Sequence, residues 1–148
     1  MADHFLFRPG DRFQAASGYH SDWPAGRGIF HNKEKTFLLW VNEGDHLRII
    51  SMQKGGDVKA VFKRLSRGVA AIETGIKRIT GRPEAFLHTK DLGMITCCPS
   101  NLGTGLRGSV HIKLPKLLRV KGHQQLDAFL RQELRCQARG TNGEHTQG

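Results

Sequence analysis

The chain has 148 residues and a mass of 16.5 kDa, which is the size of one domain. Lysine and arginine outnumber aspartate and glutamate by 23 to 13, so the net charge is +10 and an anionic partner is predicted. No apolar run approaches the ~18 residues of a transmembrane helix, and the first residues lack the pattern of a signal peptide. These features predict a soluble protein of the cytoplasm, with a mitochondrial location as the alternative.

The composition also indicates which class of anion the predicted partner belongs to. The positive charges are dispersed along the chain and only 7% of the residues are aromatic, so nucleic acid is disfavoured and a small polyphosphate fits better. The three cysteines form neither a disulfide framework nor a zinc-binding pattern. We therefore expect them to be reduced, with one of them reactive.

The first half of the chain predicts a three-stranded antiparallel sheet. Residues 27–32 and 36–42 are β-prone and flank a polar turn, which is typical of a hairpin. The second of these runs is apolar on both faces and is expected at the centre of the sheet. A third strand is predicted over 46–53, after an acidic turn at 42–45. It carries Arg48, which is either a solvated arginine at an edge or a cation that needs a partner.

A long amphipathic helix is predicted next, with Asp57 as its N-cap. Its apolar residues recur at steps of three and four and are expected to form core: Val58, Val61, Phe62, Leu65, Val69, Ile72, Ile76 and Ile79. Gly68 and Gly75 each weaken this helix by about 1 kcal/mol relative to alanine, so burial must stabilise it.

The remainder of the chain alternates irregular and regular segments. Residues 80–91 are predicted as a loop, 93–96 as a short strand, 106–114 as a further strand and 121–136 as a second helix. The last residues, 137–148, form a charged loop that contains glycine and stops without a closing element. The chain is therefore expected to be incomplete.

One stretch, residues 97–107, joins two cysteines to a turn of glycine, serine, threonine and asparagine and ends on Arg107. Such a turn can offer unobstructed backbone N–H groups to an anion, and arginine adds a charged fork for phosphate. The spacing matches neither a Walker A loop nor a dinucleotide-binding turn. The alternative is a buried cysteine before an ordinary connection between strands. Cys97 is expected as a small apolar strand residue.

Several motifs in fixed order indicate a family. They are residues 3–7 (DHFLF), 27–32 (RGIFHN), 40–43 (WVNE), 45–56 (DHLRIISMQKGG), 98–104 (CPSNLGT), 110–115 (VHIKLP) and 139–141 (RGT). Together they resemble the C-terminal catalytic domain of the phosphagen (ATP:guanidino) kinases, the family of arginine and creatine kinases. The resemblance implies an α+β fold, an antiparallel β-sheet flanked by α-helices as in glutamine synthetase-like catalytic domains.

The resemblance also implies a reaction, the reversible transfer of the γ-phosphoryl group of ATP, with Mg²⁺, to a guanidino substrate. Arginines suit this chemistry because the transferring group needs its charge neutralised. The arginines that match the family's phosphate-binding positions are Arg48, Arg107 and Arg139. The other positions matching the nucleotide site are His4, His111, Gly108, Ser109, Val110, Gly140, Thr141, Asn142 and Gly143.

At the acceptor end, Cys98 matches the reactive cysteine that the resemblance places beside the guanidinium. Glu144 matches an acidic position found in arginine kinases, which favours arginine or a related guanidine such as taurocyamine. The Gly105-Leu106 form of the loop is more similar to creatine kinases. These features imply a small guanidino compound and a nucleotide as partners, with no nucleic acid and no membrane, and allow a homodimer of the full-length protein.

One departure from the family pattern affects catalysis. The family has Asn-Glu-Glu-Asp-His at the acidic turn, whereas this chain has Gly44 at the position of the second glutamate. That carboxylate orients and deprotonates the guanidinium in the family, and loss of a general base typically costs 10²–10⁴-fold in rate. Glu144 is the candidate to retain part of the rate. The adjacent Glu43 is a further candidate catalytic residue, although it is expected to point elsewhere in a strand-like turn.

The resemblance covers only a C-terminal catalytic domain over residues 1–148, so we expect a partial chain without the family's helical N-terminal domain. Two alternatives remain open, a protein-arginine kinase and a non-catalytic nucleotide-binding remnant. The animal-like run at 49–56 argues against the first, and Gly44 favours the second. A basic nucleic-acid-binding protein has no motif in its support.

Overall fold

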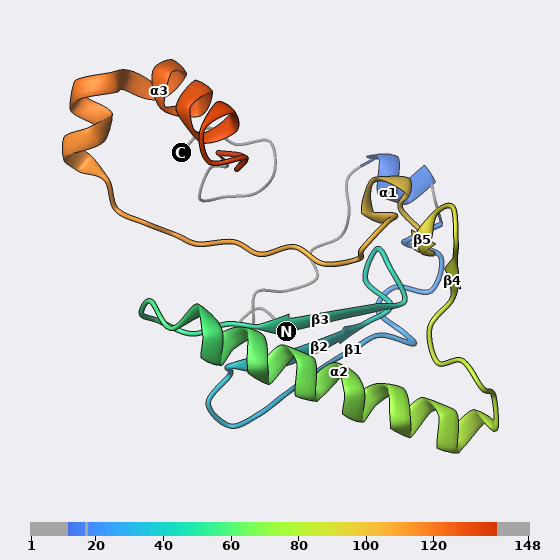
Figure 1. The fold of residues 1–148 in the computed structure, drawn as a ribbon. Coiled ribbons are helices and arrows are strands. Elements are labelled where there is room, and N and C mark those ends of the chain that lie inside the picture. Colours follow the sequence, from blue (N-terminus) through green and yellow to red (C-terminus); the bar gives the residue numbers. More distant parts are fainter. Residues whose placement is uncertain (1–11, 17, 139–148) are drawn as a thin grey trace. The chain divides into compact units, whose positions relative to one another are not determined.

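The computed structural model describes residues 12–16 and 18–138, and its ribbon is shown in Figure 1. The chain divides into two compact units, with the boundary in the sequence between Leu106 and Arg107, and each is described by itself. The first unit contains α1 (Arg12–Ala16), β1 (Gly28–His31), β2 (Phe37–Val41), β3 (Leu47–Ser51), α2 (Val58–Thr80), β4 (His88–Thr89), β5 (Gly93–Met94) and the 3₁₀ turn η2 (Pro99–Asn101). The second contains α3 (Pro115–Gln132).

The predicted three-stranded sheet is confirmed. Its strands are antiparallel in the order β1-β2-β3, so β2 is central, as its two apolar faces indicated. Leu38 on β2 is 1% exposed, the most completely buried of the described hydrophobic residues. In the β1–β2 turn, Asn32 Oδ1 accepts hydrogen bonds from the backbone N–H groups of Thr36 and Phe37, at 2.9 and 3.0 Å. The turn residues therefore set the register of the hairpin.

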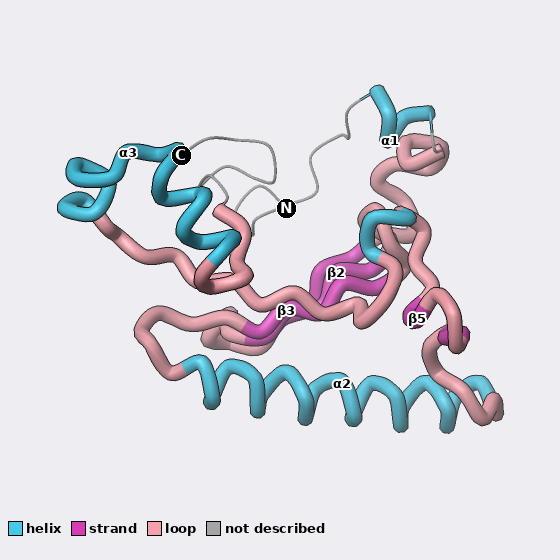
Figure 2. Tube along the Cα trace, turned by 45° about the horizontal axis from the view of Figure 1, so that its top comes forward, coloured by secondary structure: helices cyan, strands magenta, loops and turns pink. Residues whose placement is uncertain are grey.

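Helix α2 begins and ends close to the predicted positions. Asp57 caps it by accepting a hydrogen bond from Ala60 N at 2.9 Å, and Gly81 ends it in the left-handed conformation. The helix runs alongside the sheet, as Figure 2 shows. Arg64 attaches it there, because its Nη1 donates to Thr36 O and Met52 O at 3.2 and 3.3 Å.

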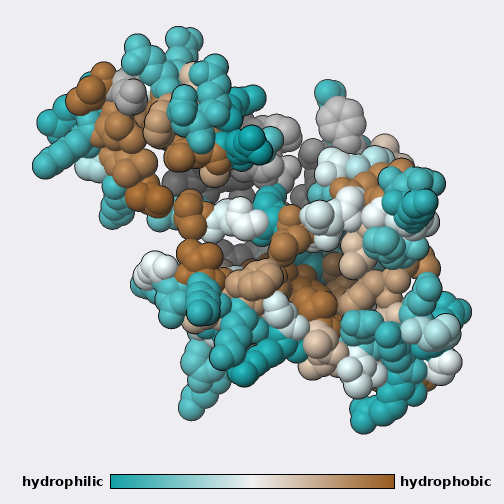
Figure 3. Space-filling view, viewed as in Figure 1, coloured by the Kyte–Doolittle hydropathy of each residue, from teal (hydrophilic) through white to brown (hydrophobic). Residues whose placement is uncertain are grey.

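The prediction that the apolar stripe of α2 is core is wrong near the helix ends. No side chain of α2 is fully buried, and Val58, Phe62 and Ile79 are 61%, 56% and 80% exposed. A helix of 23 residues spans about 35 Å, whereas a five-residue strand spans about 17 Å, so the sheet covers only part of the helix. Apolar side chains (brown) accordingly lie at the surface of the first unit in Figure 3.

The two glycines of α2 differ in their surroundings, and this difference predicts opposite mutational effects. A Cβ at Gly75 would meet nothing within 4 Å, whereas one at Gly68 would lie 2.2 Å from Phe37 Cζ. We expect Gly75→Ala to raise the free energy of unfolding by about 0.5–1 kcal/mol, because alanine is the better helix former. Gly68→Ala should show no such rise, because its Cβ would displace the Phe37 ring and the cost would cancel the gain. Urea denaturation of the two variants measures the difference, and equal stabilisation would contradict it.

The segment after α2 is more ordered than the predicted loop. Within 80–91, His88–Thr89 forms β4, which pairs with β5, and β5 is shorter than the predicted strand over 93–96. Met94 N donates to Gly103 O at 2.7 Å and Gly103 N donates to Leu92 O at 2.9 Å. Gly93 permits this close approach, because a Cβ there would lie 2.3 Å from Gly103 O. The turn that follows η2 is thereby fixed against β5.

The second unit corrects two predictions. The strand predicted over 106–114 does not form, because a strand needs a hydrogen-bonded neighbour and no described segment pairs with these residues. Their side chains are exposed. The predicted helix over 121–136 begins earlier, at Pro115, and ends earlier, at Gln132. Proline is favourable in the first helical turn, and Gly122, at φ 67° and ψ 172°, interrupts the helix. In the described part of the chain, no helix combines the length and apolar character needed to span a bilayer.

Candidate active site

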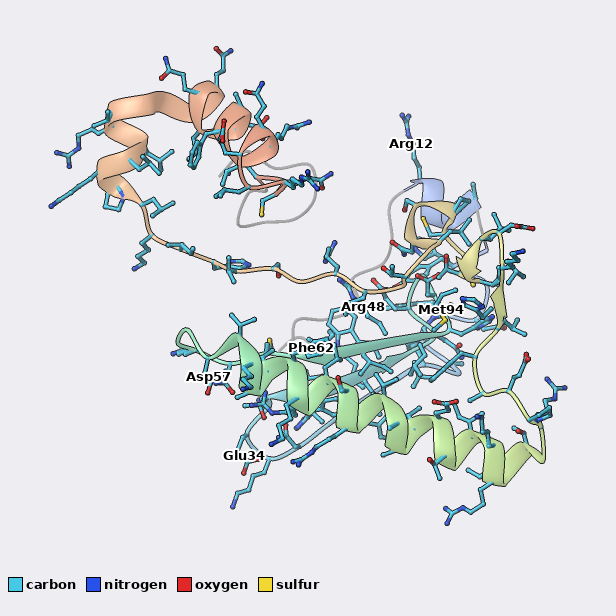
Figure 4. The ribbon with its side chains drawn as sticks, in the orientation of Figure 1. Arg12, Glu34, Arg48, Asp57, Phe62 and Met94 are labelled. Atoms are coloured by element: carbon cyan, nitrogen blue, oxygen red, sulfur yellow. The ribbon has the colours of Figure 1, made fainter. Side chains whose placement is uncertain are left out.

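The candidate site lies on the face of the sheet opposite to α2. Phe37 packs on Gly68, and Ser51 Oγ donates to Val61 O at 2.8 Å, so these two strand positions face the helix. Side chains alternate along a strand, which places the cross-strand pair Trp40 and Arg48 on the other face. Figure 4 shows Arg48 on this side.

Arg48 has partners on two sides. Its guanidinium carbon lies 5.2 Å from the centroid of the Trp40 ring, and its Nη1 lies 3.7 Å from Glu43 Oε1. The interpretation of Arg48 as an edge residue is confirmed, because β3 is an edge strand, but the arginine is not freely solvated. Its side chain is still 42% exposed, so the cation is held against an aromatic ring and remains accessible to an anion.

The acidic turn is closed by hydrogen bonds at its base. Asn42 adopts the left-handed conformation at φ 56°, which asparagine tolerates better than most residues. Its N–H donates to His46 O at 2.9 Å, and its side-chain Nδ2 donates to Gly26 O at 2.7 Å. The turn that carries Glu43 and Gly44 is thus fixed to β3 and to the segment before β1.

Asp45 links this turn to the cysteine loop. Its Oδ1 accepts hydrogen bonds from the backbone N–H groups of Cys97 and Cys98, at 2.7 and 3.2 Å, and its Oδ2 accepts one from Asn101 Nδ2 at 2.7 Å. These partners lie more than 50 residues away in the sequence. We did not predict this role for Asp45. The only signal in the sequence was its position at the start of the motif over 45–56.

The thiol of Cys98 is accessible and has a polar neighbour. Its Sγ lies 3.0 Å from Ser100 Oγ, and both cysteines of the pair are exposed. The alternative of a buried cysteine is therefore wrong, and so is the prediction that Cys97 belongs to a strand, because the backbone N–H of Cys97 is bound to the Asp45 side chain and no strand includes it.

An aromatic cluster before β1 adjoins the acidic turn and was missed by the sequence interpretation. The Arg27 guanidinium lies over the rings of Tyr19 and Trp23, at 5.2 and 5.3 Å from their centroids, and also donates to the carbonyl oxygen of Tyr19. Burial and then the negative charge of Glu43 raise the pKa of the Tyr19 hydroxyl, and Arg27 opposes this shift. The charge of Glu43 therefore acts on this cluster as well as on Arg48.

Gly44 leaves open space in the turn. Apart from its two chain neighbours, no described residue would come within 4 Å of a Cβ at this position, and the backbone is not in the left-handed region. A side chain would therefore fit here without strain. The space corresponds to the position at which the family pattern has its second glutamate.

The structure brings together only part of the predicted site. Glu43, Arg48 and Cys98 all belong to the first unit and are connected through the turn at 42–46. The nucleotide residues that belong to the second unit are exposed and lie in its irregular first segment: Arg107, Gly108, Ser109, Val110 and His111. The predicted site residues that lie outside the described residues are His4, Arg139, Gly140, Thr141, Asn142, Gly143 and Glu144.

Comparison with known proteins gives consistent matches. The family model described as ATP:guanido phosphotransferase, C-terminal catalytic domain, matches residues 1–148. An arginine kinase of Liolophura japonica is 53% identical over 146 residues, which are 98% of this chain and 38% of the relative. An arginine kinase of Anthopleura japonica is 51% identical over 145 residues, which are 98% of this chain and 19% of the relative.

Solved structures agree with these matches. A lombricine kinase structure aligns with a TM-score of 0.81 at 50% identity, over 99% of this chain and 38% of that chain. The duplicated taurocyamine kinase from Schistosoma mansoni, with bound components of a transition-state analogue, aligns with a TM-score of 0.79 at 46% identity, over 98% of this chain and 19% of that chain. The chain thus spans 38% or less of each of these relatives.

Proposed function

The chain belongs to the ATP:guanido phosphotransferase family as part of its C-terminal catalytic domain, and we propose that the protein containing it transfers the γ-phosphoryl group of MgATP reversibly to a guanidino nitrogen. The observation that carries this proposal is the arrangement around residues 43–48. Asp45 fixes the Cys98 loop beside the turn that leads into Arg48. A thiol for the acceptor and a cation for the phosphates are thereby attached to one turn.

The nucleotide end of the proposed site uses positive charge. Phosphoryl transfer depends on alignment and on neutralising the phosphate oxygens, and an accessible guanidinium such as that of Arg48 does both. We propose that Arg107 and Arg139 bind phosphate with it. The remaining residues proposed to line the nucleotide are His4, His111, Gly108, Ser109, Val110, Gly140, Thr141, Asn142 and Gly143.

At the acceptor end we propose that the Cys98 thiolate pairs with the substrate guanidinium. The Sγ atom of Cys98 lies 3.0 Å from Ser100 Oγ, within hydrogen-bond distance. Glu144 and Glu43 are proposed to supply the carboxylate that Gly44 lacks. Arginine or a related guanidine such as taurocyamine is the proposed acceptor, in keeping with relatives named arginine, lombricine and taurocyamine kinases.

The magnesium ion is proposed to enter with the nucleotide. Among the described residues no group of three or more histidine, cysteine, aspartate or glutamate side chains is arranged to hold a metal ion. Mg²⁺ often binds through substrate phosphates and water with few protein ligands, which fits this observation. We further propose a cytoplasmic location and a homodimer for the whole protein.

Nucleotide binding through Arg48 is directly testable. Replacing Arg48 by alanine in the whole protein should weaken ADP binding about 10- to 100-fold, because a hydrogen bond to a charged group contributes about 1.5–3 kcal/mol. Titration calorimetry measures the affinity, and the thermal shift with ADP provides a second readout. Arg78→Ala, at an exposed position near the end of α2, is the matched control. Equal ADP affinity of the Arg48→Ala variant and the wild type would contradict the assignment.

A second candidate function is nucleotide binding without catalysis. The observation that favours it is Gly44, since no carboxylate stands at that position of the turn. A protein that binds ADP tightly but forms no phosphorylated guanidine from arginine or taurocyamine would establish this alternative. Phosphorylation of arginine side chains in a protein substrate, without phosphorylation of the free amino acid, would instead identify a protein-arginine kinase.

A further inference from the structure

We propose that Glu43 alternates between two cations, Arg48 when no nucleotide is bound and the guanidino group of the acceptor once phosphate has taken Arg48. The inference rests on the proposed function and adds to it a regulation of the acceptor site by the nucleotide. It gives this chain a conditional replacement for the carboxylate that is missing at Gly44.

The first observation is the nature of the Glu43–Arg48 pair. The two charged atoms lie 3.7 Å apart, which is longer than a hydrogen bond, so charge alone joins them. The side chains are 23% and 42% exposed, and ion pairs of this kind are weak because water screens them. A nucleotide phosphate carries more negative charge than a carboxylate and can bind arginine with two hydrogen bonds. Phosphate is therefore expected to displace Glu43.

The second observation is that Asp45, the other acidic residue of this turn, is already occupied. Both of its oxygens accept hydrogen bonds from the cysteine loop. Moving Asp45 to a substrate would release Cys97, Cys98 and Asn101 at once. Within the described turn at 42–46, Glu43 is consequently the acidic residue that can change partner without dismantling the loop.

The third observation is the free space beside it. Apart from its chain neighbours Glu43 and Asp45, no described residue lies within 4 Å of the Cβ position at Gly44. When phosphate occupies Arg48, the Glu43 carboxylate is repelled by the phosphate and has lost its cation. The guanidinium of the acceptor is a planar cation with the same geometry as the Arg48 side chain that the Glu43 carboxylate has left. The displaced Glu43 carboxylate can contact the acceptor guanidinium in the open space beside Gly44.

This exchange has a thermodynamic consequence. Glu43 competes with the nucleotide for Arg48, so it weakens nucleotide binding when no acceptor is present. Once released, it strengthens acceptor binding, and the two ligands then favour each other by the same factor. Removing the charge of Glu43 should uncouple them.

The first experiment measures ADP binding by titration calorimetry in EDTA, with the whole protein and its Glu43→Gln and Glu73→Gln variants. Glu73 is the control, because it also forms an ion pair with a cation, Lys77, but on α2. We expect Glu43→Gln to bind ADP two- to fivefold more tightly than the wild type, the range for an exposed ion pair. Glu73→Gln should bind ADP as the wild type does. Equal or weaker ADP binding by Glu43→Gln would overturn the inference.

The second experiment measures the affinity for L-arginine with and without ADP. The wild type should bind L-arginine at least fivefold more tightly when ADP is present, and Glu43→Gln should show no such gain. The inference is overturned if the wild type shows no gain or if Glu43→Gln retains it. If ADP binds to neither the wild type nor the variants, the proposed function fails as well. If the wild type, Glu43→Gln and Glu73→Gln bind ADP equally, only the proposed exchange of partners by Glu43 is overturned.

Discussion

Replacing Gly44 by glutamate raises the rate of guanidino phosphorylation by the whole protein at least tenfold. A restored general base is expected to contribute about 10²–10⁴-fold, and the surroundings of Gly44 accept the side chain. Apart from its chain neighbours, no described residue lies within 4 Å of its Cβ position, and the backbone needs no glycine. The measurement is kcat in a coupled assay of ADP formation from ATP and L-arginine.

Two further variants separate the base from the added bulk. Gly44→Ala fills the Cβ position and Gly44→Gln adds a side chain of the same shape without a basic carboxylate, so both should keep the rate of the wild type. An unchanged kcat in Gly44→Glu, or an equal rise in Gly44→Gln, would show that this carboxylate is not the group the chain lacks.

Replacing Asp45 by alanine should lower kcat about 100-fold. The substitution removes the acceptor of three hydrogen bonds and frees the cysteine loop from the acidic turn. A displacement of about 1 Å in a reacting group can cost about 10²-fold in rate, because alignment supplies much of the catalysis. Steady-state kinetics with arginine as the acceptor measure the loss.

Two variants are controls for the Asp45 prediction: a more conservative substitution at the same position and a substitution elsewhere in the chain. Asp45→Asn retains an oxygen that can accept from the backbone N–H groups of the loop, so its loss of kcat should be smaller. Asp91→Ala removes an exposed carboxylate near β5 and should leave kcat unchanged. Thermal denaturation separates a displaced loop from an unfolded protein. Equal rates for Asp45→Ala and the wild type would show that the loop keeps its position without Asp45.

Local patterns predicted the elements whose stability is local. Two β-prone runs around a polar turn identified the hairpin, and the apolar character of both faces of the second run identified the central position of β2. The spacing of the apolar residues predicted the C-terminal end of α2 to within one residue, and Asp57 was correctly predicted as its N-cap. These features depend on neighbours a few residues away, which a sequence displays directly.

Features that depend on distant partners were not predictable in this way. Residues 106–114 alternate like a strand, but alternation does not supply a neighbouring strand. The exposed ends of α2 follow from the short length of the sheet beneath it, and the early start of α3 follows from Pro115. The family resemblance selected Arg48 and Cys98, whereas the contact that joins their segments, made by Asp45, appears only in three dimensions.

The way Asp45 holds the cysteine loop bears on how this site can evolve. Two of its three hydrogen bonds come from main-chain N–H groups, which every residue except proline provides. These two hydrogen bonds can therefore form with any residue except proline at positions 97 and 98. If Cys98 contacts the acceptor as proposed, a different side chain at position 98 can alter which acceptor is recognised without removing these two hydrogen bonds.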